Sequence, residues 1–414
     1  MSKGEAGLLF MREFLRKNFR PRRADDPPFV SGFVGFVSYD LGAKWSAEQS
    51  LLKVPVKVPV YEAICPDAHF VFVDRVFTNF EKTDQFMPGH QSQNIQQNWQ
   101  VPSGREEYFE KISRIKEYLY AGETYQVNFS QKFEAPYNGN AFELYQKLSA
   151  INPSPFQFFM ETSDWAIISN SPERLFKIRK QDGLMPPQLG SCGSRAEAAK
   201  GRGASPKRSE ASSWGKRSFP QIISTRPIKG TMPRGRTPEE DAINIQKLLA
   251  SPKEAAELAM IVDLERNDLG KLCKPGTVEV NEDRVIEKYS HVIHTVSNIR
   301  GVLMQQYDWY DALKALFPGG SVTGAPKKRT IEIISKLEGE PRGIYCGSAG
   351  WIDLSGECDF NIMIRTLWLE KNKNGGTLIF RSGGGIVVDS DPQKEYEETI
   401  HKAEALFSAM NVLK

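Results

Sequence analysis

Pro227-Ile228-Lys229-Gly230-Thr231 is the stretch from which the fold and function of this chain are best approached, because it places one lysine between a proline and a glycine. Proline restricts the backbone before Lys229, and glycine permits a close approach of backbone after it. An amine held in this way can act as a nucleophile when burial or a neighbouring charge favours its neutral form. A solvated lysine in a surface turn is the alternative.

Strands and helices follow one another in mixed order on both sides of this stretch. Strand-forming residues at 29–39 and 70–73 predict that the first hundred residues form sheet. Apolar residues at helical spacing from Tyr108 to Leu119 predict a helix that ends near Gly122. The other expected elements are strands over 125–133, 157–160 and 165–169, and helices that begin at the capping boxes 237–240 and 251–254 or span 327–337 and 392–410. This order favours an α+β fold over a repeating βαβ fold.

Composition narrows the class of protein. The chain has 414 residues, of which 40% are hydrophobic and 25% charged, and its net charge is +3. These values predict a globular protein without a dedicated nucleic-acid or membrane surface. Five widely spaced cysteines without a C-x-x-C pair fit a reducing cytoplasm. No apolar run reaches the roughly 18 residues that a membrane helix needs, so we expect a cytoplasmic protein.

One segment, residues 178–220, departs from the pattern of the rest. It is rich in Lys, Arg, Ser, Gly and Ala, and its few large apolar side chains show no core-forming period. This composition predicts a disordered basic insertion that loops out from two adjacent strands. A nucleic-acid-binding arm is the alternative, but between Lys177 and Arg217 aromatic residues are limited to Trp214.

Two glutamate pairs could form a metal site. Glu254 and Glu257 are three residues apart on one predicted helix, and Glu395 and Glu398 repeat this spacing on another, so each pair shares a helix face. All-oxygen ligation suits Mg²⁺ better than Zn²⁺ or copper. Solvated helix faces that carry glutamates for helix capping are the alternative.

Glycine-rich turns and one arginine suggest a small carboxylate as the ligand. The stretch 317–327 leads directly into a helix, and Ser382-Gly383-Gly384-Gly385 follows a strand; neither has a nucleotide-binding spacing. Arg365 alternates with apolar residues on an expected strand, where it needs a carboxylate partner from the substrate or from an internal salt bridge.

Two further side chains could transfer protons. His294 is a candidate general acid or base, or else a core histidine with its hydrogen bonds satisfied. Glu173 follows a strand in Ser171-Pro172-Glu173-Arg174, where burial would let its carboxyl protonate a leaving hydroxyl; pairing with Arg174 is the alternative.

Taken together, these motifs resemble those of the chorismate-utilising enzymes, from about Phe33 to the C-terminus. The stretches that carry the resemblance are Ala121–Asn128, Ser171–Arg174, Pro227–Thr231, Ile261–Leu269, Gly319–Lys327 and Asp389–Glu398. The resemblance implies one catalytic domain over residues 1–414, with mixed and antiparallel sheets forming a sandwich core surrounded by helices. The part covering residues 1–100 is shortened relative to the family, and residues 1–28 match nothing in it.

The resemblance also implies the reaction. Lysine at position 229 marks amination at C4 of chorismate, whereas the anthranilate-forming members usually carry alanine there. Gln126 stands where isochorismate-forming and salicylate-forming members usually carry lysine, which favours ammonia over water as the incoming nucleophile. The Lys229 amine is then expected to attack C2 while Glu173 protonates the departing C4 hydroxyl, after which ammonia replaces the lysine.

Site roles follow from the same resemblance. Glu257 and Glu398 would contact Mg²⁺ directly, and Glu254 and Glu395 through water. The remaining predicted contacts with substrate are Gln126, Thr231, His294, Ser321, Tyr345, Arg365, Gly383, Gly384 and Gly385. No cysteine lies in a plausible nucleophile elbow, so ammonia is expected from a separate glutaminase subunit, with p-aminobenzoate and folate as the downstream products. An anthranilate-forming enzyme and a non-catalytic scaffold are the alternatives.

Overall fold

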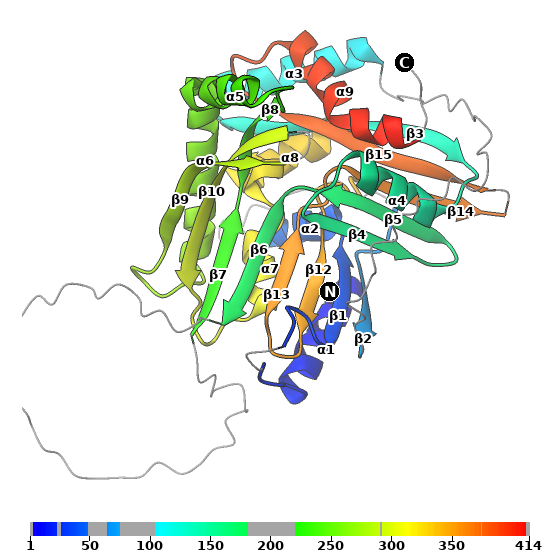
Figure 1. Ribbon diagram of the computed structural model, residues 1–414, viewed down its shortest axis with the longest axis vertical. Helices are drawn as coiled ribbons and strands as arrows, with labels where there is room; N and C mark the ends of the chain where they lie inside the picture. Colours follow the sequence, from blue (N-terminus) through cyan, green and yellow to red (C-terminus); the bar gives the residue numbers. More distant parts are fainter. Residues whose placement is uncertain are drawn as a thin grey trace, which may run out of the picture.

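Two β-sheets face each other in this protein, and helices cover their outer sides (Figure 1). The computed structural model describes residues 3–22, 26–48, 64–74, 104–180, 220–289, 292–373 and 375–410. The strand pairings within both sheets are antiparallel. The predicted α+β class with a sandwich core is therefore confirmed.

The elements are as follows. The nine-stranded sheet runs β2 (Ala68–Val73), β1 (Gly32–Val37), β12 (Ser348–Asp353), β13 (Cys358–Asn361), β6 (Arg174–Lys180), β7 (Gln221–Arg226), β10 (Val292–Val302) and β8 (Ile228–Pro233), with β9 (Glu279–Lys288) also paired to β10. The six-stranded sheet runs β11 (Gly324–Ala325), β3 (Gln126–Tyr137), β15 (Gly375–Ile386), β14 (Thr366–Asn372), β5 (Trp165–Ser171) and β4 (Phe156–Glu161). The helices are α1 (Lys3–Lys17), α2 (Tyr39–Glu48), α3 (Arg105–Tyr120), α4 (Ala141–Ile151), α5 (Pro238–Ala250), α6 (Pro252–Gly270), α7 (Trp309–Leu316), the 3-10 turn η2 (Gly320–Val322), α8 (Lys327–Glu338) and α9 (Pro392–Ala409).

Helix starts agree closely with the sequence signals. The Thr237 and Ser251 hydroxyls cap α5 and α6 by accepting hydrogen bonds from the backbone N–H groups three residues later. Helix α3 buries the apolar positions that predicted it, and Gly122 follows its last turn at φ 71°. Such a left-handed position after a helix is typical of glycine.

The N-terminal part differs from the expectation of sheet alone. Strands β1 and β2 are present, but α1 and α2 are helical. Helix α1 buries Leu8, Met11 and Leu15, and α2 buries Leu41 and Trp45, each set at helical spacing. These short apolar series lie beside strand-forming runs, and contact with the core of the nine-stranded sheet stabilises them as helices.

The predicted insertion begins and ends on neighbouring strands. Lys180, the last residue of β6, is the Cα partner of Gln221, the first residue of β7. Residues 178–180 of the predicted segment therefore belong to β6, while 181–219 lie outside the described residues. The expectation that the segment departs from two adjacent strands agrees with this pairing.

The space between the sheets is apolar at one end and polar at the other. At the apolar end, Phe36 of β1 packs with Ile167 of β5 and Trp368 of β14. Towards the other end, the inner face of β3 carries polar residues, of which Gln126 and Asn128 are the first. They alternate along the strand with apolar residues that point to the helices. A polar interior requires polar partners, so this end is where a ligand site is expected.

Helix α6 carries a buried carboxyl on its sheet-facing side. Leu258, Ile261, Val262 and Leu269 form an apolar stripe, and Glu265 lies within it with 8% exposure. Within the described part of the chain, its Oε2 atom has no hydrogen-bond partner. Burial raises the pKa of Glu265 from 4.5 to about 8.

This raised pKa makes stability depend on pH. Between about pH 4.5 and 8 the folded state holds one proton more than the unfolded state at Glu265. The free energy of unfolding therefore falls as pH rises, by up to ~1.4 kcal/mol per pH unit. We expect Glu265→Leu to remove this decline and to raise the melting temperature at pH 8 by about 2–5 °C, with a smaller difference at pH 5. Thermal unfolding at both pH values measures it; a variant less stable at both would contradict the expectation.

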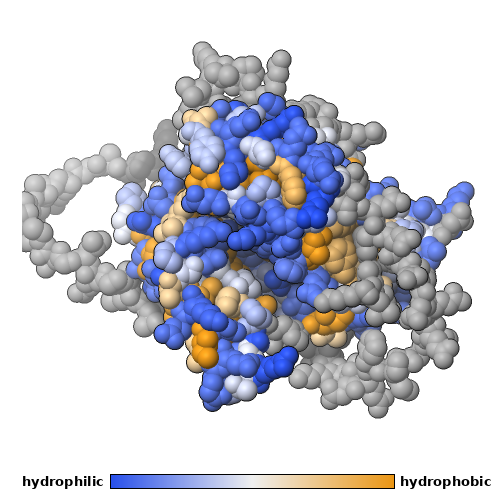
Figure 2. All heavy atoms as spheres, turned by 90° about the horizontal axis from the view of Figure 1, so that it is seen from above, coloured by the Kyte–Doolittle hydropathy of each residue, from blue (hydrophilic) through white to orange (hydrophobic). Residues whose placement is uncertain are grey.

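The face seen from above carries no single large hydrophobic patch of described residues to which an apolar partner could bind (Figure 2). Seen from above, the described atoms are mostly hydrophilic, with hydrophobic side chains in small separate groups (Figure 2). Among the described helices, none is both long and apolar enough to cross a bilayer.

Candidate active site

Lys229 lies just after a break in the sheet. Strands β7 and β8 pair with successive halves of β10, and Pro227 separates them. The Lys229 side chain is 17% exposed, and its Nζ donates a hydrogen bond to Oε2 of Glu257 at 3.1 Å. Gly230 adopts φ 87°, and a Cβ atom there would lie 2.8 Å from Leu248. Proline and glycine therefore hold this lysine beside the N-terminal part of α6, which excludes the solvated-turn alternative.

Gln126 and Gly385 meet the same amine from the other sheet. A Cβ atom on Gly385 would lie 2.7 Å from Gln126 Nε2 and 3.2 Å from Lys229 Nζ. Glycine at this position therefore leaves room between the three residues. The Gln126 side chain is fully buried, and neither its amide nitrogen nor its oxygen has a hydrogen-bond partner among the described residues. Buried polar atoms without partners are rare and mark a place for a polar ligand.

Both glutamate pairs lie beside these glycines. A Cβ on Gly384 would lie 3.2 Å from Glu395 and 3.5 Å from Glu398, and a Cβ on Gly230 would lie 3.2 Å from Glu254. Burial and then the charge of its neighbour Glu257 raise the pKa of Glu254. Burial likewise raises the pKa of Glu395, with a further contribution from Glu398. Carboxylates that are desolvated and repel one another favour a bound cation.

Lysines occupy part of this carboxylate group. Lys402 donates to Glu398 at 2.6 Å and to the carbonyl oxygen of Gly383 at 3.1 Å, while Lys229 pairs with Glu257. In this arrangement no three acidic, histidine or cysteine side chains of the described ranges are close enough together to hold a metal ion. The all-oxygen, partly buried donor set suits a hard divalent cation, so the residues fit Mg²⁺ in chemical type.

Glu173 is buried in the turn between β5 and β6. Ser321 of η2 donates its hydroxyl to Oε1 of Glu173 at 2.6 Å. Burial raises the pKa of Glu173 to about 7, against the opposing effects of Ser321 and Lys229. Arg174 instead forms an ion pair with Asp359 at 2.8 Å, so the alternative pairing with Glu173 is wrong. A carboxyl that still carries its proton near neutral pH can act as a general acid.

His294 faces the site from β10 as a neutral imidazole. Its Nδ1 and the Thr231 hydroxyl are 2.8 Å apart. Burial, followed by the charge of Arg365, lowers the pKa of His294 to about 4. Its Nε2 is buried without a hydrogen-bond partner in the described parts of the chain. The geometry therefore favours a hydrogen-bonding role over proton transfer by an imidazolium.

Arg365 does not lie on a strand, contrary to expectation. It occupies the connection between β13 and β14 with φ 51°, a conformation that is rare outside glycine and is often found at functional sites. Its alternation with apolar neighbours suggested a strand, but this backbone leaves the strand before β14 begins. Across the described ranges its guanidinium has no hydrogen bond or ion pair, and burial lowers its pKa. An internal salt bridge is thus not formed, and the charge is available to an anion.

Tyr345 completes the predicted set. It is 5% exposed, and its ring lies 5.5 Å from the guanidinium carbon of Arg342. Burial raises the pKa of its hydroxyl well above the ordinary value, so the hydroxyl stays protonated and can donate a hydrogen bond. A small pocket next to it, described below, shares no other predicted site residue.

Sequence reasoning missed Lys402 and Glu265. Lys402 is four residues after Glu398 on α9, a spacing that places oppositely charged side chains side by side. Glu265 interrupts an apolar stripe on α6. Both features can be read from the sequence, but neither shows which other helices or strands the side chain contacts.

Comparison with known proteins agrees with this geometry. The family model described as chorismate binding enzyme matches residues 8–199 and 202–408, so the expectation that residues 1–28 match nothing in the family is wrong for residues 8–28. This chain is a chorismate-binding enzyme. A similar protein is aminodeoxychorismate synthase component 1 of Escherichia coli, which is 35% identical over 95% of this chain and 80% of that protein. Anthranilate synthase component 1 of Synechocystis sp. is 40% identical over 76% of this chain.

Two further findings limit what the comparison says about the product that this chain forms. The chain spans 56% of the length of the Synechocystis protein. Among solved structures, anthranilate synthase component I of Streptococcus pneumoniae is similar with a TM-score of 0.72 and 26% identity, over 96% of this chain and 85% of that one. Relatives that form two different products are thus similar to this chain to a comparable degree.

Proposed function

We propose that this chain is component 1 of an aminodeoxychorismate synthase, which converts chorismate and ammonia to 4-amino-4-deoxychorismate. The observation that carries the proposal is the position of Lys229 beside the Gln126 amide, which has no hydrogen-bond partner among the described residues, with Glu173 nearby. An amine and a protonated carboxyl at one site suit a displacement in which a nucleophile enters and a hydroxyl leaves.

The proposed reaction has two steps. The Lys229 amine forms a bond to C2 of chorismate, the two conjugated ring double bonds shift, and the C4–O bond breaks as Glu173 gives its proton to the departing hydroxyl, which leaves as water. Ammonia then forms the C4–N bond, both double bonds shift back, and the C2–N bond to Lys229 breaks with its electron pair returning to the lysine nitrogen. The new ammonium at C4 gives a proton back to the Glu173 carboxylate. In this proposal the Gln126 amide, which has no hydrogen-bond partner within the described ranges, hydrogen-bonds the incoming ammonia.

Other residues bind and orient the substrate in this proposal. Arg365 and Tyr345 hold one carboxylate, and the neutral imidazole of His294 accepts or donates a single hydrogen bond. The glycine backbone of β15 permits close approach of the ring. Mg²⁺ held by Glu254, Glu257, Glu395 and Glu398 would neutralise the ring carboxylate when bound.

Ammonia is proposed to come from a separate glutaminase component. The similar proteins are named as component 1, which implies a second component. The four cysteines in the described residues, Cys65, Cys273, Cys346 and Cys358, have thiol pKa values raised by burial. A thiol with a raised pKa forms little thiolate and is therefore a poor nucleophile for glutamine hydrolysis. The fifth, Cys192, lies outside the described residues.

Product identification tests the proposal. The purified chain is incubated with chorismate, a magnesium salt and an ammonium salt at mildly alkaline pH, and the product is identified by NMR and mass spectrometry. Nitrogen at C4 with the enolpyruvyl group retained is the expected result. Formation of anthranilate would support the alternative function suggested by the Synechocystis relative, and chorismate turnover by neither route would favour a non-catalytic scaffold.

Arg365 provides a separate prediction about substrate binding. Because the Arg365 guanidinium has no partner in the described part of the chain, a substrate carboxylate is its expected partner, and charge-assisted hydrogen bonds contribute about 1.5–3 kcal/mol. Arg365→Gln should therefore raise KM for chorismate about 10- to 100-fold with a smaller effect on kcat. Arg365→Lys, which keeps the charge, should recover part of the loss. An unchanged KM in Arg365→Gln would show that Arg365 does not bind the substrate.

A further inference from the structure

Arg342 is a fully buried cation that touches several parts of the candidate site without lining it. Its side chain and that of Glu338 are each 1% exposed, and the two form an ion pair with N–O distances of 2.7 and 2.9 Å. Its Nη1 donates to the carbonyl oxygen of Val322 at 3.0 Å. Its Nη2 donates to the carbonyl oxygen of Asn128 at 2.6 Å. One guanidinium thus joins the end of α8 to η2 and β3.

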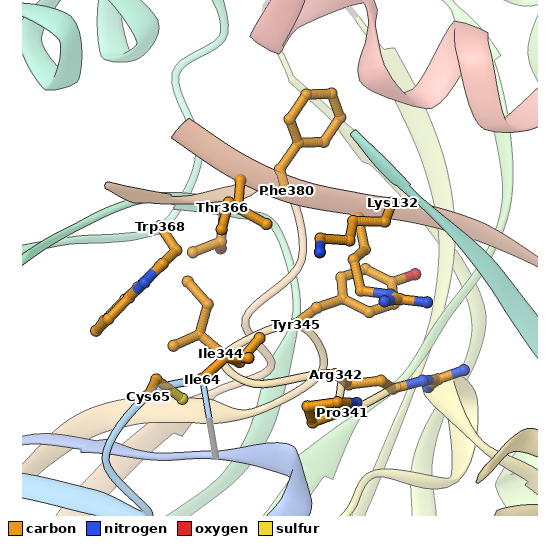
Figure 3. Close-up of a pocket in the computed structure, with 12 residues that line it drawn as sticks. Ile64, Cys65, Lys132, Pro341, Arg342, Ile344, Tyr345, Thr366, Trp368 and Phe380 are labelled. Atoms are coloured by element: carbon orange, nitrogen blue, oxygen red, sulfur yellow. The ribbon is translucent and has the colours of Figure 1, made fainter. Parts of the chain in front are cut away.

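Each of these contacts is next to a predicted site residue. Val322 follows Ser321, whose hydroxyl bonds Glu173. Asn128 is two residues beyond Gln126, on the same face of β3. The guanidinium carbon lies 4.7 Å from the ring of Tyr39 and 5.5 Å from that of Tyr345. Figure 3 shows Arg342 and Tyr345 at one side of the small pocket and Trp368 at the other.

We propose that Arg342, oriented by Glu338, is a positioning residue that holds Ser321, Gln126 and Tyr345 in their working arrangement. The proposal rests on the proposed function for the roles of these three residues. It differs from a purely stabilising role because a buried ion pair contributes little net stability: desolvation of both charges offsets much of their attraction. The two carbonyl oxygens explain why arginine is needed, since its planar fork can reach both while still pairing with Glu338.

Arg381 of β15 provides a matched control within the same charge network. It is 5% exposed, pairs with Glu338 at 3.3 Å and with Glu340 at 2.8 Å, and donates to the Ser130 hydroxyl at 3.0 Å. Among the described residues, Arg381 donates to no carbonyl oxygen of η2. Arg381→Lys therefore disturbs the network and the fold in a similar way, but leaves the bonds from Arg342 to Val322 and Asn128 in place.

The test compares Arg342→Lys with Arg381→Lys. Lysine keeps the charge but cannot hold Glu338 and both carbonyl oxygens at once. We expect Arg342→Lys to lower kcat about 10- to 100-fold, because small displacements of reacting groups have effects of this size. We expect Arg381→Lys to remain within about threefold of wild type at a similar loss of melting temperature. Equal losses of kcat in variants of equal stability would overturn the proposal.

The pH profile provides a readout that stability alone does not move. The Ser321 hydroxyl opposes the rise in the pKa of Glu173. Displacement of this hydroxyl in Arg342→Lys should therefore move the fall in kcat that accompanies deprotonation of Glu173, the Glu173 limb of the pH profile, to higher pH. Three other ionisable groups lie near Glu173: Lys229 of β8, Lys402 of α9 and Glu265 of α6. Neither Arg342→Lys nor Arg381→Lys changes these three residues. An unmoved limb in Arg342→Lys would count against positioning through Ser321.

A double-mutant comparison covers the remaining outcomes. In a Ser321→Ala background the effect of Arg342→Lys on kcat should shrink, because part of it acts through Ser321; full additivity would contradict this.

Glu338→Gln serves as a second variant if Arg342→Lys does not fold, and it should also lower kcat. Rates are taken for whichever product the wild type forms. If it forms none, calorimetric chorismate binding replaces kcat, so failure of the proposed function stays distinguishable.

Discussion

Lys229→Ala is expected to abolish formation of 4-amino-4-deoxychorismate, with a loss in kcat of at least about 10³-fold. The amine lies 3.1 Å from Glu257 and beside the space that Gly385 leaves open. Of the other lysines near these carboxylates, Lys253 is 3.8 Å from Glu257 with its side chain 60% exposed, and Lys402 pairs with Glu398. Without the nucleophile, ammonia would have to displace the hydroxyl directly. Quantified product by NMR, with saturating ammonium, measures the loss.

Lys229→Arg separates nucleophilic catalysis from charge. A guanidinium can keep the ion pair with Glu257, yet it remains protonated and is not a nucleophile at neutral pH. We therefore expect Lys229→Arg to be as inactive at C4 as Lys229→Ala. If Lys229→Arg kept a tenth or more of wild-type activity, the lysine would act through its charge alone. Anthranilate from Lys229→Ala would show that the rest of the site supports attack at C2.

Glu173→Gln is expected to lower kcat by about 10²- to 10⁴-fold, the range typical of a lost general acid. Glutamine is close to glutamate in shape and can still accept the hydrogen bond from Ser321, but it has no proton to give. Because the pKa of Glu173 is about 7, the protonated form prevails below this value. The wild-type kcat should thus fall as pH rises above about 7, and Glu173→Gln should lack this limb.

The measurement requires a constant concentration of free ammonia at each pH, since ammonium itself titrates over the same interval. Ser321→Ala is the control: its loss removes a bond that lowers the pKa of Glu173, so the limb should move to higher pH with a smaller reduction in kcat. A limb that persists unchanged in Glu173→Gln would assign the titration to another group and contradict the role of Glu173.

The sequence was most informative where local chemistry dictates local structure. The capping hydroxyls of Thr237 and Ser251 predicted two helix starts, since a cap depends on residues within one turn. It was wrong for Arg365, because alternation with apolar neighbours is shared by strands and by extended turns that leave the sheet. Helix α2 was missed as a regular element because a short apolar series becomes helical only on contact with a core.

The candidate site shows the same division. By itself, the sequence determined the candidate residues for the chemistry, since Lys229, Glu173 and the glutamate pairs occur in motifs whose spacing is local, and the motif order indicated the family. Only the tertiary structure decided which of them meet: β15 and β3 of one sheet bring Gly385 and Gln126, respectively, to the Lys229 amine on the other sheet. It also excluded the pairing of Glu173 with Arg174, raised the pKa of Glu173 and left the guanidinium of Arg365 without a partner among the described residues. Such properties depend on desolvation and on distances between residues far apart in the chain, which residue order does not encode locally.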